Sequence, residues 1–104
     1  MDDRETALFR RLEFAIISVL AHYGGHYKEE MVEWYSALRL GLPQLTDERQ
    51  LREVFVSLST EGIVDLADFP VGEAESGIIP FTSTLTPAGL AYWNSLQADP
   101  RVQL

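Results

Sequence analysis

The sequence predicts one small α+β domain over residues 1–104, mostly helical with a small β-hairpin. Three observations predict this fold class. Apolar residues recur at helical spacing in three successive segments of the first two thirds of the chain. Two short β-branched segments around a loop with Pro and Gly come next, and a fourth helical segment follows them. With 46% hydrophobic residues, a chain of 104 residues can bury one core but not two.

The first predicted helix covers residues 5–22. Apolar side chains such as Leu12 and Ile16 fall on one face of it, at about 100° per residue. Gly24 and Gly25 follow, and glycine readily adopts the left-handed conformation that commonly ends a helix. The glycine pair therefore predicts where this helix ends.

The second predicted helix covers residues 28–40. Met31 and Tyr35 are four residues apart and would lie on the same face. Glu29 and Glu30 would occupy the first turn, where the helix dipole favours negative charge.

The third predicted helix covers residues 46–61 and has the clearest pattern. Thr46 is a favourable N-cap residue, and Gly62 follows as a stop. The apolar stripe follows the spacing i, i+3, i+4, i+7, which predicts a buried face made of Leu51, Val54, Phe55 and Leu58.

A β-hairpin is predicted over residues 63–85, with strands at 63–66 and 77–85. The second strand contains Pro80, which has no N–H to donate, so we expect an edge position or a bulge.

The fourth predicted helix covers residues 86–98. Thr86 is expected to be its N-cap and Pro87 its first residue, a position that suits proline. Leu85, just before the cap, is expected to pack on Leu90 and place that side chain in the core.

The order of these elements resembles winged helix-turn-helix regulators of the PadR and MarR kind. Two short motifs carry the resemblance: Leu-Ser-Thr-Glu-Gly-Ile-Val at residues 58–64 and Leu-Thr-Pro-Ala-Gly-Leu at residues 85–90. In those families the first motif joins the third helix to the wing, and the second joins the wing to the last helix. The resemblance covers residues 46–96. Folding alone would also select the same residues, as helix stops, helix starts and core side chains.

The resemblance implies a DNA-binding transcriptional regulator whose third helix reads the major groove. The side of this helix opposite its apolar stripe would carry Arg49, Glu53, Val56 and Thr60, with Arg52 beside them. Arginine can contact phosphate or guanine, threonine can hydrogen-bond, and valine can meet a thymine methyl group. These five residues are the candidate DNA-binding site.

Charge supports an alternative function. Sixteen Asp and Glu against eight Lys and Arg give a net charge of −8, and no basic residue lies between Arg52 and Arg101. A phosphate backbone would repel a wing that carries only negative charges, here Asp65, Asp68, Glu73 and Glu75. The alternative is an acidic winged-helix protein–protein interaction module with no DNA binding of its own, which could block or modulate a nucleic-acid-binding partner.

A partner or dimer surface is predicted on the first helix. Phe14 lies about 180° from its core face, with Ile17 and Ala21 nearby. Trp93 on the last helix could meet Phe14 within one chain, or a second subunit could cover both. The resemblance implies a homodimer formed by the terminal helices.

Other classes of function find little support in the sequence. The absence of cysteine excludes disulfides, thiol catalysis and cysteine-bound metals. His22 and His26 have a metal-binding spacing, but two glycines interrupt the helix between them. No nucleophile motif is present, so we expect no enzyme activity, catalytic residue, metal or cofactor. The acidic start of the chain and the lack of a long apolar run predict a cytoplasmic protein that does not enter a membrane.

Overall fold

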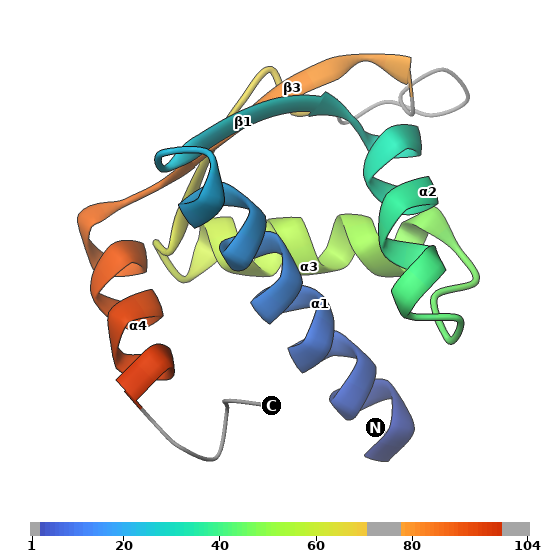
Figure 1. The fold of residues 1–104 in the computed structure, drawn as a ribbon. Coiled ribbons are helices and arrows are strands. Elements are labelled where there is room, and N and C mark those ends of the chain that lie inside the picture. The colour runs from blue at the N-terminus through green and yellow to red at the C-terminus, as the bar shows by residue number, and fades with distance from the viewer. Residues whose placement is uncertain (1–2, 71–77, 99–104) are drawn as a thin grey trace.

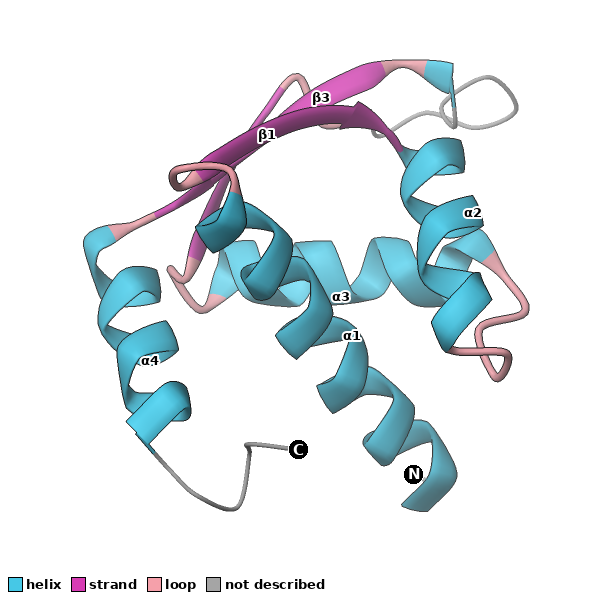
Figure 2. Ribbon diagram, viewed as in Figure 1, coloured by secondary structure: helices cyan, strands magenta, loops and turns pink. Residues whose placement is uncertain are grey.

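The computed structural model describes residues 3–70 and 78–98, and these form four helices and a three-stranded antiparallel sheet (Figure 1). The elements in chain order are α1 (Asp3–His22), β1 (His26–Glu30), α2 (Met31–Gly41), α3 (Glu48–Thr60), β2 (Val64–Ala67), β3 (Pro80–Leu85) and α4 (Pro87–Ala98). The sheet lies along one side of the helices, with α2 near one end and α4 near the other (Figure 2). The predicted α+β class is confirmed.

Helix α1 ends where the glycine pair predicts. Gly24 and Gly25 have φ values of 79° and 100°, in the left-handed region that favours glycine. The Gly25 N–H donates to the Leu20 carbonyl at 2.7 Å, which satisfies one of the free carbonyls at the end of the helix.

The predicted start of the second helix is wrong, because residues 26–30 form strand β1. Tyr27 pairs with Ser83 and Glu29 with Phe81, both in β3. Helix α2 therefore begins at Met31, and Glu29 precedes it instead of occupying its first turn. The physical reason is that β3, far along the chain, supplies hydrogen-bond partners that local helix preferences do not anticipate.

The predicted two-stranded hairpin is also incomplete, because the strand order is β1-β3-β2. The strand that contains Pro80 lies in the centre of the sheet, so the expected edge position is wrong. Pro80 is the first residue of β3, where its missing N–H is tolerated, and it pairs with Glu30 at the end of β1. Residues 71–77, part of the predicted loop and second strand, lie outside the described residues.

The N-cap of helix α3 is one residue later than predicted, at Asp47 instead of Thr46. The N-cap is Asp47, whose carboxylate accepts the Arg49 N–H at 2.9 Å. The Gln50 side chain in turn accepts the Asp47 N–H at 3.1 Å, and this completes a capping box. Thr46 donates its own N–H to the same Gln50 oxygen instead of capping the helix.

One hydrophobic core joins the helices to the sheet. The predicted apolar stripe of α3 is fully buried, and α1 contributes Leu12, Ile16, Ile17 and Leu20. Edge-to-face aromatic contacts cross this core: the Phe55 ring lies 5.2 Å from the Trp34 ring and 5.1 Å from the Phe81 ring.

Helix α4 begins as predicted but presents a different face. Pro87 is its first residue, and the Thr86 hydroxyl accepts the Gly89 N–H at 2.9 Å. The prediction that Leu90 lies in the core is wrong, since this side chain is 50% exposed. The reason is that Gly89 occupies the contact side, where an added Cβ would lie 2.0 Å from the Ile63 carbonyl oxygen.

The described residues include the four helices α1 to α4. None of them combines the length and apolar character needed to cross a membrane.

Candidate functional site

The predicted DNA-reading residues lie on the side of α3 that faces away from the core. Arg49, Glu53 and Thr60 are exposed, and the Val56 side chain is 47% exposed. This arrangement agrees with the helical spacing from which the set was chosen.

Arg52 differs from the others because its guanidinium contacts the same chain. Its Nη1 donates to the Pro70 carbonyl, and its Cζ lies 5.5 Å from the centroid of the Phe69 ring. These contacts tie α3 to the segment that follows β2. Arg49 is left as the more available cation of the predicted pair, since its side chain is exposed.

Acidic residues outnumber basic ones on and around α3. Residues 48–68 contain two arginines, Arg49 and Arg52, and five carboxylates: Glu48, Glu53, Glu61, Asp65 and Asp68. Of these five, only Glu48 is partly buried. This part of the surface therefore has a negative balance of charge, which is unfavourable for contact with phosphates.

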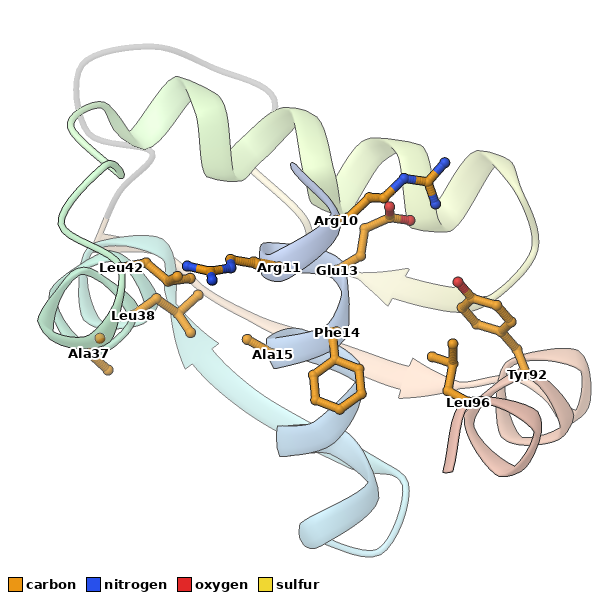
Figure 3. A pocket seen from close by; sticks show the side chains of 11 residues that line it. Arg10, Arg11, Glu13, Phe14, Ala15, Ala37, Leu38, Leu42, Tyr92 and Leu96 are labelled. Atoms are coloured by element: carbon orange, nitrogen blue, oxygen red, sulfur yellow. The ribbon is translucent and has the colours of Figure 1, made fainter. Parts of the chain in front are cut away.

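A groove of about 760 Å³ lies between α1, α2 and α4 (Figure 3). Figure 3 shows Phe14 of α1 in its middle. On one side lie Leu38 of α2 and Leu42, which follows that helix, and on the other lie Tyr92 and Leu96 of α4. We call it the α1/α2/α4 groove; its full lining is Arg10, Arg11, Glu13, Phe14, Ala15, Ala37, Leu38, Gly41, Leu42, Tyr92 and Leu96.

The predicted partner surface on α1 is only partly accessible. The Phe14 and Trp93 rings are 5.5 Å apart, so the two residues meet within one chain, and Phe14 is half-buried. Ile17 is 0% exposed, so its assignment to a partner surface is wrong: α1 packs against α3, α4 and β3, and this side chain lies in the core. Ala21 is half-buried.

Charged side chains lie along the α1 part of the groove. Burial raises the pKa of the Glu13 carboxyl, and the nearby Glu61 raises it further, whereas Arg10 lowers it. Arg11 lies beside Leu42 in the same view (Figure 3). The groove therefore combines an apolar middle with two arginines and one partly buried acid.

The sequence prediction placed Trp93 of α4 near Phe14 but did not name the residues that α2 and α4 contribute to this groove. One signal was present: the twelve residues of α4 include no charged side chain, although 23% of the whole chain is charged. A helix that is apolar on several sides is normally covered on several sides.

Metal binding finds no support in the geometry. Within residues 3–70 and 78–98, no group of three or more His, Cys, Asp or Glu side chains comes together in a way that could hold a metal ion.

Comparison of the chain with protein-family models, with curated proteins and with solved structures gives no significant match.

Proposed function

We propose that this protein is a winged-helix protein–protein interaction module that does not bind DNA. The winged-helix part of this proposal is supported by the order of elements, in which a hairpin follows three helices and precedes a fourth. Strand β1, which the predicted order did not include, joins this hairpin as a third strand beside β3.

The charge around α3 is the observation that carries the functional part. Five carboxylates and two arginines lie in residues 48–68, and one of those arginines, Arg52, bonds to the Pro70 carbonyl of its own chain. Affinity for DNA comes mainly from cations that neutralise phosphates. A surface of this charge is suited to a basic protein surface, including one that otherwise holds nucleic acid.

Fluorescence anisotropy with two labelled probes tests this proposal. We expect no binding to a mixed-sequence DNA duplex at about 50 mM salt, where electrostatic attraction is strong. An arginine-rich peptide should bind, and the triple substitution E48Q/E53Q/D65N should weaken that binding.

A charge-matched control separates a local effect from the overall charge. D2N/D3N/E5Q also changes the net charge from −8 to −5, but at the start of the chain. Equal weakening by both triple variants would contradict a binding surface at α3.

DNA reading is a second candidate, favoured by the exposure of Arg49, Val56 and Thr60 on one side of α3. On that hypothesis, duplex binding would be present, would weaken steeply with salt, and would be lost in Arg49→Ala combined with Arg52→Ala. Such a result would replace the interaction module as the proposed function.

We also propose that a second copy of the chain covers the α1/α2/α4 groove in a homodimer. Each copy carries a charge of −8, so two copies repel over most of their surface. The uncharged helix α4 offers an apolar contact without that repulsion.

Light scattering tests the homodimer. The unaltered protein should be dimeric, and Phe14→Glu should give a folded monomer, whereas Val56→Glu on α3 should leave the dimer intact. Since Phe14 also contacts Trp93, Tyr92→Glu, at a residue 37% exposed, serves as a second groove variant. A monomeric unaltered protein, or a dimer that persists in both groove variants, would rule out this interface.

A further inference from the structure

A second hollow, of about 300 Å³, lies where α1, β1 and α2 meet. We call it the Tyr27 hollow; it is lined by Val19, Tyr23, Tyr27, Glu29, Glu33, Trp34, Ala37 and Leu38. It shares Ala37 and Leu38 with the α1/α2/α4 groove but differs from it in chemistry, because its polar lining is aromatic and acidic.

Three aromatic rings form one part of this hollow. The Tyr23 and Tyr27 rings stack with their centroids 4.7 Å apart, and the Tyr27 ring meets the Trp34 ring edge to face at 5.4 Å. Tyr23 is 53% exposed, so solvent reaches this end of the stack. The faces of tyrosine and tryptophan rings attract cations.

Two carboxylates, Glu29 and Glu33, lie beside the rings, and no lysine or arginine among the described residues lines the hollow. Side chains alternate along a strand, so Glu29 lies on the same face of β1 as Tyr27, and Lys28 lies on the opposite face. The Glu29 carboxylate is held in place because it accepts the Glu30 N–H at 2.9 Å.

The Tyr27 hydroxyl reports the electrostatic character of the hollow. Its pKa is raised by loss of solvent and, after that, by Glu29, Tyr23 and Glu33. The charges of Glu29 and Glu33 therefore both act at the Tyr27 hydroxyl, and a cation placed beside this hydroxyl would be stabilised by both.

Trp34 contributes a further polar group. The residue is 3% exposed, and its indole Nε1–H has no hydrogen-bond partner in the part of the chain that the structure describes. A buried donor of this kind is normally satisfied by some acceptor. The apolar lining of Val19, Ala37 and Leu38 suits the methylene stem of a long basic side chain.

From this combination we infer that the Tyr27 hollow binds the side chain of a lysine or arginine of a partner protein. The inference rests on the proposed function in one respect, namely that the partner is a protein with basic groups. It does not use the exposed side of α3, and of the α1/α2/α4 groove it shares only Ala37 and Leu38. The charged and aromatic groups on which it depends lie outside both surfaces, so each proposal can fail alone.

Nuclear magnetic resonance of the ¹⁵N-labelled protein tests the inference through the indole N–H signal of Trp34. Trp93→Phe assigns that signal, because the chain has only two tryptophans. We expect N-acetyl-arginine amide and N-acetyl-lysine amide to shift the signal with saturation in the millimolar range, about what one small contact site supplies. The uncharged N-acetyl-norleucine amide should not shift the Trp34 signal, and neither should an equal concentration of NaCl.

A pair of matched variants locates the site. E29Q/E33Q should weaken binding of the arginine amide roughly tenfold, since two partly exposed charge contacts are lost. D2N/D3N at the start of the chain changes the net charge equally and should leave it unchanged. The inference would be overturned by equal affinity in the two variants, by an equal shift with the norleucine amide, or by no saturable shift with either cation. Unchanged peptide binding in the α3 triple variant, with arginine amide still bound by the hollow, would contradict the proposed function alone.

Discussion

Helices α3 and α4 are nearly equal in length, with 13 and 12 residues, but they differ in how far their apolar side chains are buried. Helix α3 buries Leu51, Val54, Phe55 and Leu58 completely and leaves mainly charged and polar groups in solvent. Helix α4 has no charged group, and Leu90 and Tyr92 remain exposed. The difference teaches that the core accounts for the apolar residues of α3 apart from Val56, but leaves both Leu90 and Tyr92 of α4 in solvent. This contrast is the basis for proposing the α4 side as a contact surface.

The largest expected effect on stability concerns the contact between Gly89 of α4 and the Ile63 carbonyl. Gly89→Ala would place a Cβ 2.0 Å from the Ile63 carbonyl oxygen, so the helix must move away from its anchor. We expect a loss of about 3 kcal/mol in the free energy of unfolding, the upper end of ordinary overpacking. Urea denaturation followed by circular dichroism measures it.

Gly41→Ala is the matched control, at the end of α2. An added Cβ there meets nothing within 4 Å, and alanine is the better helix former, so stability should be unchanged or slightly higher. A Gly89→Ala variant as stable as this control would contradict a close contact between α4 and the Ile63 carbonyl.

The next effect compares the two N-caps. Asp47→Ala should cost about 1 kcal/mol, the usual value for a lost cap at an exposed site. Thr86→Ala should cost more, because the hydroxyl accepts the Gly89 N–H and also donates to the turn after α3, with the Gly62 carbonyl at 2.5 Å. Thermal unfolding ranks the two variants, and the reverse order would contradict the idea that this hydroxyl joins α4 to α3.

A smaller effect is expected from the exposed apolar residues themselves. Leu90 and Val56 are 50% and 47% exposed, so Leu90→Ser and Val56→Ser remove similar surfaces from α4 and α3. Each should change the stability of an isolated chain by no more than about 0.5 kcal/mol. Ultracentrifugation should show weaker self-association for Leu90→Ser but not for Val56→Ser. Equal self-association of the two variants would contradict a contact surface on α4 that α3 lacks.

The smallest effect concerns Glu13, beside the groove. Because its pKa is raised in the folded state, mainly by burial, folding favours the protonated carboxyl over the charged one. Stability should therefore fall as the pH rises from the ordinary value of 4.5 through the raised pKa. Glu13→Gln should remove this slope, with a small gain at pH 7 and none below pH 4.5. Denaturation midpoints measured across this range would contradict the account if both proteins changed in parallel.

The sequence by itself determined the local features of this protein. Helical spacing identified the buried stripe of α3, the glycine pair marked the end of α1, and Thr86-Pro87 marked the start of α4. Each depends on residues within a few positions of one another, through spacing, backbone conformation or capping. The outward side of α3 was predictable for the same reason.

Only the tertiary structure decided the features that depend on distant partners. Residues 26–30 became a strand because β3 offered hydrogen bonds, Ile17 became core because α1 is covered on several sides, and Leu90 became exposed because Gly89 fits against Ile63. The α1/α2/α4 groove and the Tyr27 hollow arise in the same way, since each joins elements that sequence spacing cannot relate. Packing places a side chain by all of its neighbours at once, and the sequence shows directly only those nearby along the chain.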